Sequence, residues 1–240
     1  MGAKGIFTIA ESQPCPALAE VVERLKREFD PVQVGRWNFD IRQFRSTTSS
    51  TDGASRGAPA APSFLQILSQ PTRAGPLEVT VTTTVEAQSQ TTISIPPDQV
   101  EGFLQLVASK LGGLWAPRPT LQVSGGSVYD LGEFFVRVGE LRQAGSQVAS
   151  RGLIVLIEEA DQASSDENGS GGSISLAGPA TRDENRVDRD VTAARDTLRN
   201  VWDSLQMEGA KEFIRAGPRD PGATRFDEAQ LCCEALRLRS

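Results

Sequence analysis

Residues 134–141 read Phe-Phe-Val-Arg-Val-Gly-Glu-Leu, and residues 153–159 read Leu-Ile-Val-Leu-Ile-Glu-Glu. Both runs are rich in β-branched and apolar residues, and a polar loop that contains glycine separates them, which is typical of two paired strands. In the second run the apolar residues occupy both faces of the strand, and one of these faces carries Ile154 and Leu156. Such a strand must be covered on both faces, by the core on one side and by a helix or a partner protein on the other.

Further short strands are predicted on the N-terminal side of this pair. Between residues 35 and 42, the apolar residues Trp37, Phe39 and Ile41 alternate with polar ones, which indicates a half-buried strand with one wet face. Residues 77–85 alternate in the same way in threonine-rich sequence. The other segments with strand character are residues 5–10, 64–68, 91–95, 120–124 and 128–131, the last two separated by a turn at Gly125–Gly126.

Apolar residues recur at helical spacing in three places, residues 17–29, 100–111 and 188–207. The first two are followed by proline or glycine, which are common stop signals for a helix. In the third, Trp202 lies on the apolar stripe, and we expect it to be a core residue. Residues 226–238 favour a last short helix.

Taken together, these elements decide the fold class. About eight short strands, antiparallel by their spacing, and three amphipathic helices do not follow the regular alternation of strand and helix that a parallel α/β sheet requires. We therefore predict an α+β fold, an antiparallel β-barrel of about eight strands with flanking amphipathic helices. The side chains expected to fill the barrel are Val79, Val81, Thr83, Val85, Phe134, Val136 and Val138.

Two segments interrupt this pattern. Residues 46–62 consist largely of Ser, Thr, Gly, Ala and Pro, and residues 160–187 of Ser, Gly, Asp and Glu. Neither contains enough large apolar side chains to form a core, so both are predicted to be flexible insertions. The expected organisation is a single barrel-like domain over residues 1–217, followed by a C-terminal tail over residues 218–240.

The composition excludes several classes of function. The 240 residues contain no histidine, which removes the Ser–His and Cys–His nucleophile pairs and the commonest metal ligand. The three cysteines have neither the spacing of a zinc site nor that of a disulfide framework. A net charge of −6 argues against direct binding to DNA or RNA. No apolar run is long enough for a membrane span or a secretory signal, so we expect an intracellular protein. From the missing histidines and the cysteine spacing we also expect no cofactor and no metal.

The residues that could carry chemistry have simpler interpretations. Glu158 and Glu159 are adjacent on a strand and point to opposite faces, so they cannot converge on one substrate, and we expect a solvated strand end. Ordinary surface ion pairs account for the two arginines near Glu140, which are Arg137 and Arg142. The adjacent Cys232 and Cys233 are expected to pack locally in the tail. The residues alone predict an interaction protein and no enzyme.

Several stretches resemble the fungal-type Mediator complex subunit 20 family. The most specific is the pair of strands joined by a loop that closes with Arg–Gly, which spans residues 128–139 and 151–158. The similarity covers nearly the whole chain apart from the two insertions and the residues after 217. The other matching stretches are residues 5–10, 30–37 and 63–69, the helix of Trp202, and residues 208–212.

This resemblance implies a nuclear, non-catalytic subunit of the Mediator head module with a barrel fold. It implies pairing with Mediator subunit 18, and a C-terminal helix of subunit 8 that tethers the pair to the other head subunits. The expected function is that of a scaffold in the coactivator that links activators to RNA polymerase II. We expect the partner-facing side chains to come from two strands, as Trp37, Phe39, Ile41, Ile154 and Leu156.

Two other functions remain open at this point. A phosphohydrolase of the triphosphate-tunnel kind needs carboxylates at alternating positions of a strand, and no strand here carries them. A ligand-binding β-barrel of the lipocalin type is disfavoured by the two insertions and by the missing secretion signal. Both alternatives can be tested directly, the first by a triphosphatase assay and the second by a search for bound lipid.

Overall fold

The computed structural model describes residues 2–11, 18–47, 63–71, 77–85, 89–145, 149–160, 184–217 and 224–237. Over these ranges it contains ten strands, four α-helices and one turn of 3₁₀ helix, η1 (Pro97–Gln99). The helices are α1 (Leu18–Phe29), α2 (Val100–Lys110), α3 (Glu184–Ser204) and α4 (Thr224–Ala235). The strands are β1 (Gly2–Ala10), β2 (Val32–Ser46), β3 (Phe64–Pro71), β4 (Leu77–Val85), β5 (Ser89–Ile95), β6 (Trp115–Pro117), β7 (Thr120–Asp130), β8 (Phe134–Ala144), β9 (Ala149–Glu159) and β10 (Lys211–Gly217).

The strands form one antiparallel sheet, which confirms the predicted α+β class. Their order is β10-β1-β9-β8-β7-β2-β3-β4-β5, and the short β6 pairs with β2 beside this path. The apolar runs at residues 134–141 and 153–159 belong to the paired strands β8 and β9, with Val138 opposite Val155 in register. The structure has ten strands where about eight were predicted, because β6 has only three residues and β10 carries three charged residues, so alternation alone does not find them.

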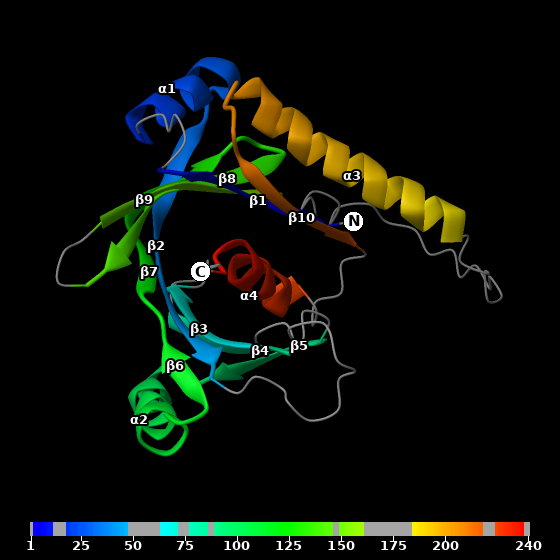
Figure 1. Cartoon of the computed structure of the whole chain (residues 1–240). Helices are drawn as coiled ribbons and strands as arrows, with labels where there is room; N and C mark the ends of the chain where they lie inside the picture. The colour runs from blue at the N-terminus through cyan, green and yellow to red at the C-terminus, as the bar shows by residue number, and fades with distance from the viewer. Residues whose placement is uncertain are drawn as a thin grey trace, which may run out of the picture.

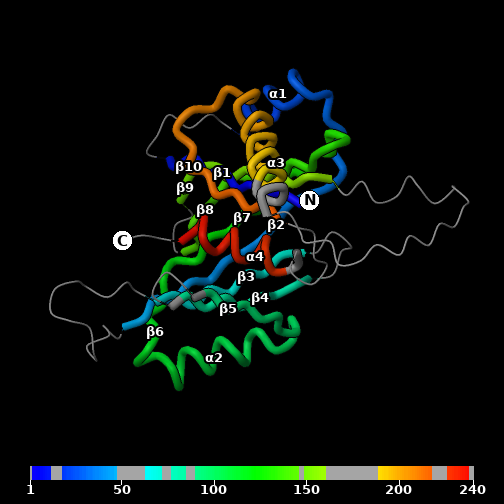
Figure 2. Tube along the Cα trace, turned by 90° about the vertical axis from the view of Figure 1, so that its right-hand side faces the viewer, coloured from blue at the N-terminus to red at the C-terminus, as the bar shows by residue number. Residues whose placement is uncertain are grey.

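The sheet curls into a half-barrel, and its two edge strands β10 and β5 lie on the same side of the molecule (Figure 1). The C-terminal helix α4 lies inside the curl, between β1 and β10 above and β3 to β5 below (Figure 1). The view from the side shows the same arrangement, with α1 and α3 above the sheet and α2 below it (Figure 2). We call the side that faces α4 the inner face and the side that carries the other three helices the outer face.

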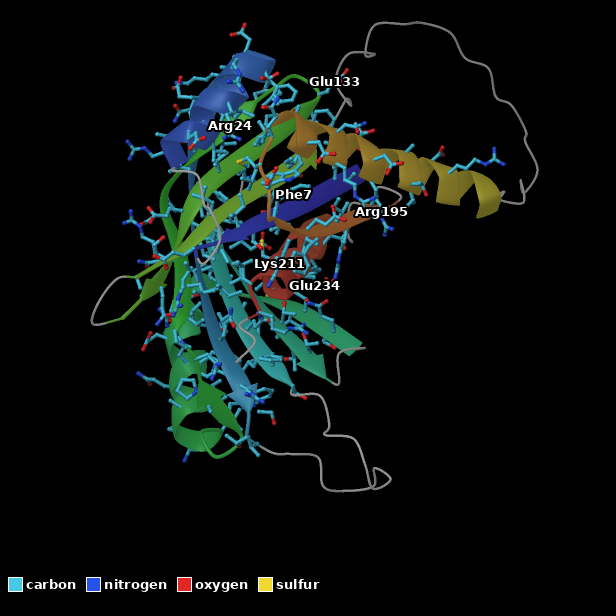
Figure 3. The ribbon with its side chains drawn as sticks, turned by 45° about the horizontal axis from the view of Figure 1, so that its top comes forward. Phe7, Arg24, Glu133, Arg195, Lys211 and Glu234 are labelled. Atoms are coloured by element: carbon cyan, nitrogen blue, oxygen red, sulfur yellow. The ribbon has the colours of Figure 1, made fainter. Side chains whose placement is uncertain are left out.

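The upper part of the outer face packs against α1 and α3. Phe7 of β1 stacks on Trp202 of α3, with ring centroids 4.4 Å apart and an interplanar angle of 1°. Figure 3 shows Phe7 on β1 beneath α3, and Arg24 on α1. Arg24 Nη1 donates to the backbone carbonyl of Leu205 at 3.1 Å, so the two helices are also joined to each other. The prediction that Trp202 is a core residue is confirmed, since its side chain is 6% exposed.

The lower part of the outer face packs against α2. Val107 of this helix is fully buried against the side chains that β3 and β4 direct outward, which are Leu65, Ile67, Val79 and Val81. The apolar side of the helix predicted over residues 100–111 therefore packs against the sheet, as its amphipathic pattern indicates. Helix α2 ends at Lys110, close to the predicted end.

The structure reverses the predicted inside and outside of the strands. Val79 and Val81 contact α2, and Val136 and Val138 belong to the cluster under α1 and α3, so all four lie on the outer face. The prediction that they fill the barrel was wrong because alternation separates two faces but does not say which face is concave. The inner face instead carries the alternate residues, several of which are polar.

Three boundaries also differ from the sequence expectation. Residues 120–130 form one strand, β7, in which the pairing with β8 shifts between Val123 and Ser127, so Gly125 belongs to an irregularity within the strand and not to a turn. The segments 48–62 and 161–183 of the predicted insertions lie outside the described residues, as do residues 218–223 of the tail. Helix α3 begins at Glu184, before the predicted end of the second insertion.

Candidate functional site

The five side chains expected to face a partner lie together on the inner face of the half-barrel. Exposed fractions are 3% for Trp37, 4% for Phe39 and 0% for Ile41, Ile154 and Leu156. All five belong to one buried cluster, in which α4 contributes Ala229, Leu231, Cys232, Cys233 and the following Leu236. They come together although their strands are more than a hundred positions apart in the sequence.

The side chains that cover this cluster come from the chain's own C-terminal helix. Because α4 occupies the inner face, a partner could contact Ile154 or Leu156 only after this helix moved away. Contact of the five residues with a partner stays a prediction. What the structure adds is the covering helix, which the sequence analysis expected to come either from the chain or from a partner.

A cluster of four charged side chains joins α4 to the sheet. Glu228 of α4 lies 2.6 Å from Arg137 Nη1 and 3.5 Å from Lys4 Nζ. Glu158 lies 2.8 Å from Lys4 Nζ and 3.1 Å from Arg137 Nη2. Each cation thus contacts both carboxylates, and all four side chains are less than a fifth exposed. The formal charges of the cluster cancel, as a buried ionic group requires.

The pKa directions agree with this arrangement. Burial opposes the charge of Glu228, but Arg137 and Lys4 outweigh it and hold the pKa of this carboxyl below its usual value. Burial likewise opposes the charge of Lys4, and the carboxylates of Glu228 and Glu158 hold its pKa above the usual value. Glu228 and Lys4 are therefore both charged at neutral pH.

These contacts correct two expectations from the sequence. Arg137 was expected in an ordinary surface ion pair and Glu158 at a solvated strand end, but both point to the inner face beneath α4. Arg142 does form the expected surface pair, with Glu140 at 2.7 Å. The partner that the sequence did not suggest is Glu228, because a carboxylate on a short polar helix is most often solvated.

Side-chain amides bind the other end of α4. Gln66 Nε2 donates to the carbonyl of Cys233 at 2.8 Å, and Gln43 Nε2 donates to the carbonyl of Leu236 at 2.7 Å. The last carbonyls of a helix have no partner within the helix, so these two buried amides satisfy groups that would otherwise be left without one. Their donors stand on neighbouring strands, β3 and β2.

The adjacent cysteines lie at the centre of this contact. Cys232 is 1% and Cys233 is 0% exposed. Burial raises the pKa of the Cys232 thiol well above its usual value and that of Cys233 to about 12. Both thiols are therefore neutral and inert, and the predicted packing role is the one that the structure gives them.

The charged cluster lacks the features of a catalytic centre. Its two carboxylates, Glu158 and Glu228, are each bonded to both Lys4 and Arg137, which leaves neither as a base or as a ligand for an ion. Across the ranges that the structure describes, no three side chains of His, Cys, Asp or Glu are grouped so that they could hold a metal. The polar groups of the inner face bind α4 to the sheet through ion pairs and hydrogen bonds.

Comparison with known families decides what this fold belongs to. The family described as TATA-binding related factor of subunit 20 of the Mediator complex matches residues 1–231. The chain belongs to the Mediator subunit 20 family. This confirms the resemblance found in the sequence and supports a Mediator subunit, for which the family implies a nuclear location. None of the described helices combines the length and the hydropathy that crossing a bilayer requires.

Two solved structures are similar to this family member at low identity. The protein PH1819 from Pyrococcus horikoshii OT3 is 11% identical, with a TM-score of 0.44, over 94% of this chain and 99% of that chain. The putative adenylyl cyclase HpAC1 from Hippeastrum, which is described as having a dominant triphosphatase activity, is 11% identical, with a TM-score of 0.35, over 84% of this chain and 88% of that chain. The comparison with curated proteins found no match.

Proposed function

We propose that the chain is a non-catalytic scaffold subunit of the Mediator head module in the nucleus. In this proposal it pairs with Mediator subunit 18, and the C-terminal helix of subunit 8 and other head subunits join the pair to the RNA polymerase II machinery. The observation that carries the proposal is the family match over residues 1–231. Membership of a family of complex subunits favours a role in which the surface of the fold, rather than a catalytic pocket, is the functional part.

The inner face supports a scaffold over an enzyme. A phosphohydrolase of the tunnel kind or a ligand carrier needs open space inside its barrel, and here α4 fills that space with Leu231, Cys232 and Cys233. The carboxylates of Glu158 and Glu228 on this face are already paired with Arg137 and Lys4. Both features favour a filled, rigid core.

The outside of the molecule supports binding to other proteins. Among the residues that the structure describes, six large apolar side chains are about half exposed or more, which leaves apolar contact area available to a partner. They are Val32, Val34, Leu77, Ile93, Leu106 and Leu114.

Co-expression with subunit 18 from the same organism tests the pairing. Size-exclusion chromatography with light scattering is expected to show a stable 1:1 complex. The variant Val34→Asp changes a residue that is 53% exposed and leaves the buried clusters intact, so it can report on the surface without unfolding the chain. A folded monomer that never associates with subunit 18 would contradict the proposed pairing.

A triphosphatase assay with manganese tests the enzymatic alternative. We expect no turnover, because the paired carboxylates cannot bind a metal ion. Turnover that disappears in Glu158→Gln, with the fold intact by circular dichroism, would refute the non-catalytic assignment. Turnover that persists in this variant and co-purifies with the chain would also refute the non-catalytic assignment, with a site away from Glu158.

A further inference from the structure

The contact between α4 and the inner face has the character of an interface between two units that can separate. A row of four polar side chains crosses the sheet beneath the helix, one from each of four neighbouring strands, and consists of Gln43, Gln66, Thr82 and Thr92. The first three of these are at most 1% exposed. Contacts that bury polar as well as apolar side chains are typical of separable units, because water satisfies the polar groups once the units are apart.

Hydrogen bonds fix one position of the helix on this face. The two glutamines of the row donate to backbone carbonyls at the end of α4 and just beyond it. Gln230 Nε2 of α4 donates to Thr92 Oγ1 at 3.1 Å, and in the first turns of the helix Glu228 accepts from Arg137 at 2.6 Å. Because these contacts lie along the whole helix, a helix of this sequence fits the inner face in a single register, whichever copy of the chain supplies it.

The charges of the helix and the sheet are complementary as well. Arg215 of β10 lies 3.8 Å from Asp227 and 3.5 Å from Glu234, and Figure 3 shows Glu234 on α4. Together with Glu228, these residues give the helix three carboxylates that meet basic side chains of the sheet. The inner face is thus complementary to an acidic helix, and the sequence that satisfies all of its contacts is that of α4 itself.

The connectivity allows this helix to come from another copy. All ten described strands precede α4 in the chain, so a single connection, residues 218–223, joins the helix to the sheet. Within the described sheet, the edge strands β10 and β5 are not paired with each other, and the half-barrel is open between them (Figure 1). A helix can therefore leave the inner face, and another can enter, without any strand pair being broken.

We propose that α4 exchanges between two copies of the chain, so that each half-barrel holds the helix of the other copy. A second copy is the partner that brings an identical helix, and the exchanged pair has twofold symmetry, which closes it as a dimer. The contacts between helix and sheet are the same in the dimer and in the monomer. The two differ in the connection and in the entropy of association, so the dimer forms as the protein concentration rises. This inference goes beyond the proposed function and does not depend on subunit 18.

Cross-linking of the wild-type chain tests the exchange directly. Equal amounts of unlabelled and heavy-isotope-labelled chain are incubated together at about 1 mM, the effective concentration typical of a short connection. A carbodiimide then joins lysines to the carboxylates that they contact. Lys4 contacts Glu228 of α4 at 3.5 Å and Glu158 of β9 at 2.8 Å. We expect Lys4–Glu228 products that combine a labelled with an unlabelled peptide, and Lys4–Glu158 products that do not, because β1 and β9 stay paired within one chain.

The concentration dependence of these products separates exchange from non-specific association. We expect the mixed Lys4–Glu228 fraction to fall at least tenfold on a dilution of roughly a hundredfold. If labelled and unlabelled peptides never combine in the Lys4–Glu228 products, the exchange is refuted. Mixed Lys4–Glu158 products at the same frequency would refute it too, since the sheet does not exchange.

Two charge-reversal variants, each in a Cys15→Ser background, provide a second measurement. Glu228→Lys reverses the charge on the helix and Arg137→Glu reverses it on the sheet, so each variant alone is expected to release α4 and to expose its two cysteines to a disulfide reagent. In an equimolar mixture, exchange of the helices brings opposite charges together in both half-barrels. We expect labelling at least tenfold slower than in either variant alone, and a dimer with one copy of each variant by native mass spectrometry.

The double variant Arg137→Glu/Glu228→Lys is the matched control, because it restores opposite charges within one chain. We expect its thiols to be protected in a monomer at the same low concentration. A protected double variant, together with a mixture that is labelled at the mean rate of the two single variants, would overturn the exchange. Where the single variants do not fold, the cross-linking of the wild type decides alone.

Discussion

The carboxylate of Glu228 accepts a hydrogen bond of 2.6 Å from Nη1 of Arg137, a residue 91 positions earlier in the chain. This contact joins the first turns of the C-terminal helix to the centre of the sheet. Glu228 also contacts Lys4 at 3.5 Å, so a single side chain of α4 links the N-terminal strand to the middle of the chain. We infer that Glu228 decides whether α4 stays in the half-barrel.

Removal of the Glu228 charge is therefore expected to destabilise the protein strongly. In Glu228→Gln the two cations retain only Glu158, and loss of one partner from a buried pair costs about 3–5 kcal/mol of unfolding free energy. The matched control is Asp227→Asn on the same helix, since Asp227 is 43% exposed and lies 3.8 Å from Arg215. Surface pairs contribute about 0–1 kcal/mol. Urea unfolding measures both, and equal midpoints for the two variants would contradict the role of Glu228.

The pH dependence of stability should report the same carboxyl. The pKa of Glu228 is lower in the folded chain than its ordinary value of 4.5, with burial opposing and Arg137 and Lys4 causing the shift. The folded state then binds fewer protons than the unfolded state, so the stabilisation is present above pH 4.5 and is lost as the pH falls through the folded pKa. Urea midpoints at pH 3 to 7 should fall less steeply for Glu228→Gln than for the wild type. Parallel curves would show that Glu228 has no such linkage.

Much of this architecture could be predicted from the sequence, because it depends on local periodicity. The helix predicted over residues 17–29 is α1, and the alternation in residues 77–85 is β4. The apolar runs of β8 and β9 paired as expected. Each of these elements buries enough apolar surface for its pattern to be visible in one dimension.

The inner face could not be predicted, because its character depends on contacts between distant segments. Nothing in the spacing of Lys4, Arg137 and Glu228 indicates that three polar residues from β1, β8 and α4 meet beneath one helix. Alternation also left the direction of curling undecided, and Val79, Val81, Val136 and Val138, which were predicted to be interior, lie on the outer face. Strand β10 was missed because its charged residues resemble a loop, although they are what protects a sheet edge.

The buried thiols provide a measure of whether α4 stays in the half-barrel. With the pKa of Cys233 raised to about 12, roughly one thiol in 10,000 is ionised at pH 8, and only the thiolate reacts with disulfide reagents. In a Cys15→Ser background, we expect Cys232 and Cys233 to be labelled only as fast as α4 leaves the sheet. Glu228→Gln should accelerate the labelling, and Asp227→Asn should not. Labelling of the wild type at the rate of a free thiol would show that α4 does not cover these residues in solution.

The glycine that follows Arg151 is the most restrictive position that we find in the sheet. Gly152 has a φ of +116°, and a Cβ at this position would lie 1.8 Å from the backbone carbonyl oxygen of Ile9, so Gly152→Ala requires the β1–β9 pairing to separate. Gly102 on α2 has no atom within 4 Å of such a Cβ, and Gly102→Ala should stabilise the helix by about 0.5–1 kcal/mol. We expect Gly152→Ala to lower the melting temperature steeply or to prevent folding, and Gly102→Ala to raise it by a few degrees. Thermal unfolding followed by circular dichroism compares the two, and a stable Gly152→Ala variant would mean that β1 and β9 are not paired closely at this residue.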